Sequence, residues 1–235
     1  MFQTFLVQPI YNAFVYLVGH MPFGDVGFAI IAITIIMRVV LYPVFTASIR
    51  TQMGMQAMQP ELDQVTERYK NDKEALTRER IALLKKYKVN PFAAIVALAI
   101  QLTVIIALYF ALFNEGFPEI NRELLYAFVP PPETISTNFF GLLDLLTPQH
   151  LVLALLVGLS QYVAIRLTLK RTPVAQNLTS DKAQMHRMQQ QLMLYMMPAL
   201  MAVFSYFFAG AVGLYFLAGN ILSVGQEWLI RRHVL

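Results

Sequence analysis

Five long apolar segments constrain this chain more than any other feature. They cover residues 26–45, 91–113, 150–168, 191–209 and 211–230. A helix that crosses a membrane needs roughly 20 apolar residues, and the apolar residues here fall in runs rather than alternating as in a strand. Only 14% of the residues are charged, against about 25% in soluble domains. The pattern predicts an all-α, polytopic membrane protein with five transmembrane helices in one domain, residues 1–235.

The last two apolar segments, 191–209 and 211–230, are almost adjacent in the sequence. Either one long helix covers residues 191–230, or the chain turns back near Gly210. Gly210 and Gly213 disfavour a continuous helix, so we expect a tight hairpin. The third segment, 150–168, is shorter than the second and carries Ser160 and Gln161 among its apolar residues.

The basic residues divide the loops into two classes. Sixteen of the 18 Lys and Arg residues lie in residues 46–90, in residues 166–190 or at the C-terminus. The loop 114–149 holds Arg122 and five acidic residues, Glu115, Glu119, Glu123, Glu133 and Asp144. Because cytoplasmic loops collect Lys and Arg, the N-terminus is expected outside, the loop 114–149 outside and the C-terminus in the cytoplasm. Five crossings satisfy this arrangement.

Two segments outside the spans are expected to be helical. Residues 2–18 carry a thin polar stripe of Gln3, Thr4, Gln8 and Asn12, which predicts a helix lying in the outer headgroup boundary. The alternative, an extra span, would break the charge pattern. Residues 48–90 carry apolar residues at helical spacing on both sides of a turn near Asp72, which predicts a cytoplasmic helical hairpin. Its candidate residues are Met55, Met58, Pro60, Tyr69, Asp72 and Tyr87.

Arg38 is a basic residue inside the first predicted span, seven residues from its end at Phe45, whereas Arg166 lies at the very end of the third. A charged residue at the centre of a bilayer costs about 2.5–3.5 kcal/mol on insertion scales. Arg38 either extends its side chain towards the cytoplasmic boundary, about 10 Å away along the helix, or faces a water-filled cavity within the bundle. Polar residues elsewhere in the spans favour a cavity, although each alone is more typical of a bond between helices. They include Thr34, Gln101, Gln161, Tyr215 and Asn220.

The residue types present argue against several functions. The chain has no cysteine, and its four histidines lie at span ends or in loops. No acidic residue lies deep in a predicted span, whereas proton-coupled pumps place Asp, Glu or His there. We therefore expect no enzyme activity, no bound metal and no cofactor. The basic balance of the chain is explained by topology, so no sequence-specific nucleic-acid partner is expected.

The chain resembles the YidC/Oxa/Alb membrane-protein insertases in their short, five-span form. The resemblance covers nearly the whole chain outside the N-terminal helix and the outer loop. It is carried by Arg38 followed by Pro43, by the hairpin sequence 55–92 ending in "KVNPF", and by the "GLYF…N…Q" pattern over 213–226. The family often has proline soon after the glutamine of the second span, where this chain has Leu102 and Thr103.

The resemblance implies a function. Members of the family insert client segments through a hydrophilic groove in the inner leaflet, without nucleotide hydrolysis, and cooperate with ribosomes and the Sec translocon. It implies a prokaryotic plasma membrane, nascent membrane proteins as clients and the lipid bilayer as their destination. The groove residues it implies are Arg38, Thr34, Gln101, Gln161, Tyr215, Phe216 and Asn220. A small-solute transporter or channel, or a structural subunit of a membrane complex, is the alternative.

Overall fold

The protein is described by a computed structural model covering residues 3–114, 119–170, 188 and 190–234. The described part is mainly helical. In the labels, α marks an α-helix, η a short 3-10 or π helix and β a strand. The elements follow in this order: η1 (Gln3–Val7), α1 (Gln8–His20), η2 (Pro22–Gly24), α2 (Val26–Val40), α3 (Tyr42–Arg68), α4 (Lys73–Lys86), α5 (Pro91–Tyr109), η3 (Phe110–Asn114), η4 (Arg122–Leu124), β1 (Asn138–Phe139), β2 (Leu143–Asp144), α6 (Leu151–Lys170), η5 (Leu192–Met196), α8 (Met197–Phe207) and α9 (Gly210–Val234).

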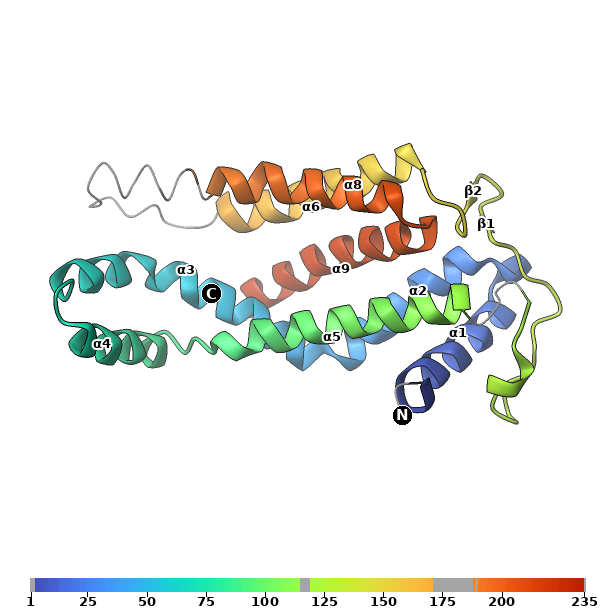
Figure 1. The fold of residues 1–235 in the computed structure, drawn as a ribbon, viewed down its shortest axis with the longest axis horizontal. Coiled ribbons are helices and arrows are strands. Elements are labelled where there is room, and N and C mark those ends of the chain that lie inside the picture. Colours follow the sequence, from blue (N-terminus) through green and yellow to red (C-terminus); the bar gives the residue numbers. More distant parts are fainter. Residues whose placement is uncertain (1–2, 115–118, 171–187, 189, 235) are drawn as a thin grey trace.

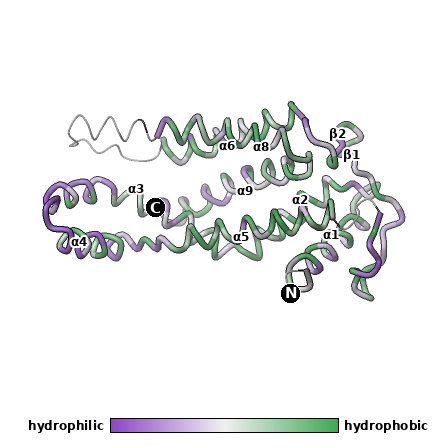
Figure 2. The backbone as a smooth tube through the Cα atoms, viewed as in Figure 1, coloured by the Kyte–Doolittle hydropathy of each residue, from purple (hydrophilic) through white to green (hydrophobic). Residues whose placement is uncertain are grey.

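The helices form an elongated bundle with a different structure at each end (Figure 1). At one end α3 and α4 project as a hairpin, and at the other lie α1, η4 and the antiparallel pair β1 and β2. Between the ends, α9 packs against both α2 and α6, and α8 packs against α6. Figure 2 shows the hairpin mostly hydrophilic and the bundle mostly hydrophobic. This arrangement confirms an all-α, polytopic membrane protein.

The number of crossings stays a prediction. Two described helices are individually long and apolar enough to cross, Pro91–Phe113 and Leu151–Leu169. The bent pair α2 and α3 could supply a third, and the apolar stretch Leu192–Phe207 is shorter. The last predicted span corresponds to α9, and the loop 166–190 lies largely outside the described residues.

The first predicted span, 26–45, is not one straight helix. α2 ends at Val40, Leu41 leaves helical geometry, and α3 departs at 73°. Pro43 explains the break, because proline has no N–H to donate and its ring collides with the carbonyl four residues earlier. The helical hairpin therefore starts within the predicted span, at Tyr42, instead of at residue 48.

The hairpin at the end of the chain is confirmed. α8 ends at Phe207, Phe208 is extended, and α9 begins at Gly210. Gly213 lies against Ser205 of α8, and a Cβ atom added at Gly213 would be 2.5 Å from the Ser205 Oγ atom. The two helices therefore approach so closely at Gly213 that a larger residue there would displace the Ser205 side chain.

The N-terminal helix differs from its prediction. α1 continues to His20, and Tyr11, Phe14 and Val18 are fully buried against the bundle. The predicted polar stripe is partly covered by protein, because Gln8 and Asn12 both donate to the carbonyl oxygen of Leu124, at 3.1 and 2.8 Å. The reason is that the outer loop has backbone groups that need partners, and these amides supply them.

Asn12 is expected to stabilise the contact between α1 and the outer loop. Its Oδ1 atom accepts from the Tyr126 N–H at 2.7 Å, and its side chain is 2% exposed. Asn12→Ala would leave that N–H without its partner, lowering the free energy of unfolding by about 1–2 kcal/mol. Thermal unfolding in detergent, followed by circular dichroism, measures the change. Thr4→Ala at an exposed position is the control; equal midpoints for the two variants would contradict the prediction.

The projecting hairpin is confirmed as two helical arms. Met58 of α3 and Leu83 of α4 are its buried apolar residues, whereas Met55 is 39% exposed. The Asp72 carboxylate caps α4 by accepting from the N–H groups of Glu74 and Ala75. α3 continues through Pro60, which lies inside the first arm of the hairpin, and the helix is followed by its C-cap residue, Tyr69.

A polar cluster joins the two arms. Lys86 Nζ lies 2.7 Å from both Glu61 carboxylate oxygens, and the Tyr87 hydroxyl donates to Glu61 Oε1 at 2.6 Å. The bond from Lys86, followed by that from Tyr87, lowers the pKa of Glu61. The bond to Glu61 raises the pKa of Lys86.

These pKa shifts predict how hairpin stability depends on pH. The Glu61 contribution is complete above the unfolded pKa of glutamate, about 4.3, and is lost as the pH falls through the lower folded value. The Lys86 contribution is complete below the unfolded pKa of lysine, about 10.4, and is lost as the pH rises through the higher folded value. Glu61→Gln should therefore speed amide hydrogen exchange in α3 and α4 at pH 7, and differ progressively less from wild type towards pH 3. Glu74→Gln, in the exposed pair with Arg78, is the control, and an unchanged rate in Glu61→Gln at pH 7 would contradict the prediction.

Candidate functional site

Arg38 lies in the last turn of α2, immediately before the break at Leu41. Its Nη2 atom donates to the carbonyl oxygen of Gly219 at 3.0 Å and to the Ser223 Oγ atom at 2.5 Å, both on α9. The guanidinium carbon lies 4.4 Å from the centre of the Phe45 ring in α3. The break between α2 and α3 thus lets residues on both sides of it surround Arg38.

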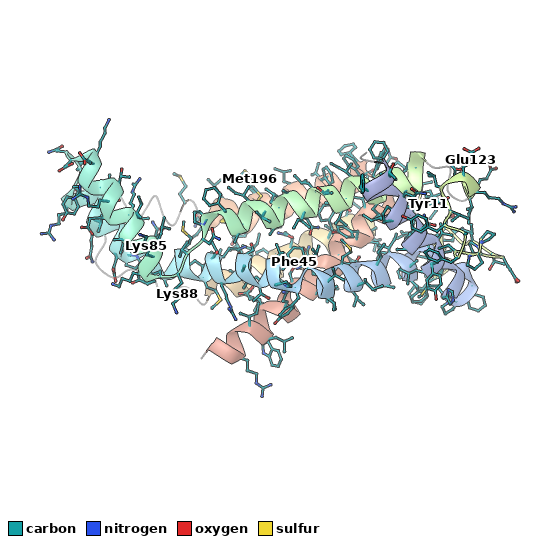
Figure 3. The ribbon with its side chains drawn as sticks, turned by 90° about the horizontal axis from the view of Figure 1, so that it is seen from below. Tyr11, Phe45, Lys85, Lys88, Glu123 and Met196 are labelled. Atoms are coloured by element: carbon teal, nitrogen blue, oxygen red, sulfur yellow. The ribbon has the colours of Figure 1, made fainter. Side chains whose placement is uncertain are left out.

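A pocket lies beside Arg38 where α2, α3, α5 and α9 meet. Figure 3 places Phe45, which lines it, near the middle of the molecule, between Lys85 and Lys88 of the hairpin and Tyr11 and Glu123 at the opposite end. The pocket is small, with room for about one water molecule. Its lining is formed by Thr34, Met37, Arg38, Leu41, Phe45, Gln101, Val104, Tyr215 and Gly219.

Two polar side chains face each other across the pocket. Gln101 Nε2 of α5 donates to the Tyr215 hydroxyl of α9 at 2.9 Å. Tyr215 is 5% exposed, so this bond satisfies a hydroxyl that would otherwise be costly to bury. Thr34 is also buried, but its hydroxyl donates to the Ile30 carbonyl of its own helix at 2.6 Å.

The structure brings together four of the seven groove residues expected from the sequence. Arg38, Thr34, Gln101 and Tyr215 line one pocket. Gln161, Phe216 and Asn220 do not line it. Asn220 donates to the Ser160 hydroxyl of α6 at 3.0 Å, and the Phe216 ring packs edge-on against Phe204 of α8.

The helical spacing of α9 explains this division. α9 lies between α2 and α6, so its opposite faces contact different helices. Tyr215, Gly219 and Ser223 recur every four residues and share the face towards α2, whereas Phe216 and Asn220 lie on the next face. Polarity alone could not separate these faces, because both carry polar residues.

The sequence alone did not identify several of the residues that line the pocket. Met37, Leu41, Phe45 and Val104 are apolar and carry no signal that separates pocket lining from lipid-facing surface. Gly219 contributes a backbone carbonyl, which no side-chain pattern reveals. Ser223 bonds Arg38 without lining the pocket. It stands among the polar residues of the last predicted span but was not assigned to the groove, although its spacing from Tyr215 places both on the same face of a helix.

The charge of Arg38 is not neutralised by an acidic residue within the described part of the chain. The ion pairs found there, Arg78 with Glu74 and Lys86 with Glu61, are both on the hairpin. The acceptors on Arg38 are a carbonyl and a hydroxyl, which are neutral. The site is therefore a partly buried positive charge beside a pocket of apolar and neutral polar groups, and its chemistry suits attraction of a negatively charged group.

Comparisons with known proteins agree on one family. Residues 18–235 match the family described as "60Kd inner membrane protein". A curated relative from Histophilus somni (strain 2336), "Membrane protein insertase YidC", is 31% identical over 208 residues, covering 88% of this chain and 33% of the relative. A relative of the same name from Oceanobacillus iheyensis is 29% identical and is covered to 75% of its length, with 89% of this chain covered. This chain spans about a third of the length of the first curated relatives it matches.

Proposed function

Because this chain belongs to the 60Kd inner membrane protein family, the family of the YidC/Oxa insertases, we propose that it inserts client segments into a bacterial inner membrane. The observation that carries the proposal is Arg38, a cation inside the helical bundle whose acceptors are neutral. An embedded charge without an acidic partner is costly to maintain, and attraction of a client's acidic residues gives it a use.

The proposed mechanism begins with an acidic residue in the outer segment of a client. Arg38 attracts this residue, and Thr34, Gln101 and Tyr215 supply neutral polar contacts that partly replace water. The pocket holds about one water molecule, so it must widen to admit a client side chain. The client's apolar helix then moves into lipid, and the transfer of apolar surface out of water, worth about 25 cal/mol per Å², drives the step.

The remaining roles follow from the arrangement of the helices. We assign Gln161, Phe216 and Asn220 to the wall formed by α6, α8 and α9, which the client passes on its way into lipid. The hairpin of α3 and α4, with Met55, Met58, Pro60, Tyr69, Asp72 and Tyr87, receives clients in the cytoplasm. Ribosomes and the Sec translocon are the proposed partners. The mechanism uses no catalytic side chain, metal, cofactor or nucleotide.

The proposed topology has five crossings, with the N-terminus outside and the C-terminus in the cytoplasm. The distribution of basic residues supports it, since Lys and Arg concentrate in cytoplasmic loops. In this orientation the hairpin of α3 and α4 is cytoplasmic, and α1 lies at the outer boundary with the loop 114–149.

Reconstitution tests the proposal directly. Purified protein in liposomes should insert a single-span client with an acidic outer segment well above the level seen with empty liposomes. Protection of the client's outer segment from added protease measures insertion. Equal protection with and without the protein would overturn the proposal, and a flux of small solutes without client insertion would favour a channel or transporter.

A further inference from the structure

The hydrogen bonds of Arg38 are all made by one of its nitrogen atoms. Nη2 carries two N–H groups, and it has two acceptors, the Gly219 carbonyl and the Ser223 hydroxyl. A guanidinium has five N–H groups in all. Within the described residues, the three N–H groups on Nη1 and Nε have no hydrogen-bond partner from the protein, so they are available to a ligand or to water.

Ser223 is oriented to accept from Arg38. The Ser223 hydroxyl donates to the Gly219 carbonyl at 2.8 Å, one helical turn earlier. With its hydrogen directed to that carbonyl, the Oγ atom presents its lone pairs to Nη2 of Arg38 at 2.5 Å. Ser223, the Gly219 carbonyl and the guanidinium thus form a closed set of three hydrogen bonds.

No other described side chain makes a hydrogen bond to Arg38. The Thr34 hydroxyl is directed to its own helix, and Gln101 is directed to Tyr215. Phe45 covers the guanidinium from one side, 4.4 Å from its ring centre, but a ring contact does not fix the direction of the N–H groups. The hydroxyl of Ser223 is therefore the side-chain group that holds Arg38 towards α9.

The kind of acceptor matters as much as its position. A carboxylate at this place would form an ion pair and cancel the positive charge of Arg38. A hydroxyl and a carbonyl hold the guanidinium and leave its charge in place. Without them, a long arginine side chain near the end of a membrane helix is free to extend towards the aqueous boundary.

We infer that Ser223 is a positioning residue that keeps Arg38 beside the pocket with its charge intact and so sets the preference for clients with acidic outer segments. This inference rests on the proposed function and deepens it. Ser223 acts through Arg38 and not by touching the client, so its effect should appear in the ratio of insertion between acidic and neutral clients.

The test compares two clients that differ only in the outer segment, one with Asp and Glu and one with Asn and Gln. In proteoliposomes Ser223→Ala should lower the acidic-to-neutral ratio about fivefold, the equivalent of roughly 1 kcal/mol. Ser223→Thr keeps a hydroxyl at this position and should keep the wild-type ratio. Ser223→Asp should pair with Arg38 and remove the preference for the acidic client. Insertion of the neutral client should change little in all three variants.

Thr103→Ala is the matched control, because the Thr103 hydroxyl donates to the Ala99 carbonyl of its own helix and does not line the pocket. Unchanged ratios in both Ser223→Ala and Ser223→Asp, with an active wild type, would overturn the inference. So would an effect of Ser223→Ala that persists undiminished in an Arg38→Ala background. Failure of the wild type to insert any client would instead overturn the proposed function.

A second measurement does not depend on insertion. Phenylglyoxal modifies free guanidinium groups, and mass spectrometry reports its reaction at Arg38 separately from other arginines. Ser223→Ala should increase modification of Arg38 several-fold, and Thr103→Ala should not. Equal modification in wild type and Ser223→Ala would show that Ser223 does not hold the guanidinium, whatever the result of the insertion assay.

Discussion

Arg38→Ala is expected to lower insertion of single-span clients with acidic outer segments about tenfold. A hydrogen bond to a charged group contributes about 1.5–3 kcal/mol, and 1.4 kcal/mol corresponds to a factor of ten. The reason is structural: Arg38 is the cation that lines the described pocket. The measurement is the initial rate of client protection from protease in proteoliposomes containing equal amounts of each variant.

Two controls separate the charge of Arg38 from its packing. Arg38→Lys keeps the charge but not the planar guanidinium, so it should retain most of the activity. A client with a neutral outer segment should be affected little by Arg38→Ala. If wild type and Arg38→Ala insert the acidic client equally well, the charge mechanism is wrong, although insertion by another route would remain.

Gly213→Ala is expected to lower the free energy of unfolding by about 3 kcal/mol, the upper end for an overpacked interior. The added Cβ atom would lie 2.5 Å from Ser205 Oγ and 2.9 Å from Leu153 Cδ2. Both neighbours are buried side chains, of Ser205 on α8 and Leu153 on α6, so they can turn aside only by displacing other packed groups. Thermal unfolding in detergent, followed by the helical circular dichroism signal, measures the effect.

Gly225→Ala is the matched control in the same helix. A Cβ atom added at Gly225 meets nothing within 4 Å, and alanine favours a helix over glycine by about 1 kcal/mol. The two substitutions should therefore shift the unfolding midpoint in opposite directions. A Gly213→Ala midpoint equal to that of wild type would mean that α8 and α9 are not packed as closely as described.

The sequence revealed much of the hairpin and only part of the pocket. Asp72 was expected at the turn, and it caps α4 through two backbone N–H groups. A cap depends on residues within one helical turn, so a local pattern suffices to find it. Pro43 marks a helix break that a local pattern can indicate, but the direction and size of the 73° bend between α2 and α3 are seen only in the structure.

The N-terminal helix is a second case in which the sequence alone could not identify the partners of a polar side chain. Its polar stripe predicted a surface facing water and headgroups, and the structure instead pairs Asn12 with backbone groups of the outer loop, more than 100 residues later in the chain. An amide side chain has the same polarity in either case. Only the fold decides whether water or a distant peptide group satisfies it.

By itself, the sequence determined the class of protein and its helical character, because long apolar runs can be accommodated in few ways and charge asymmetry fixes an expected orientation. It also identified Arg38 as the residue that most needs an explanation. Only the tertiary structure decided which face of α9 meets Arg38, that a carbonyl and the Ser223 hydroxyl hold it, and that Asn220 bonds α6 instead. The physical reason is that these contacts join residues up to 185 positions apart, whose proximity depends on how the helices pack and not on any local pattern.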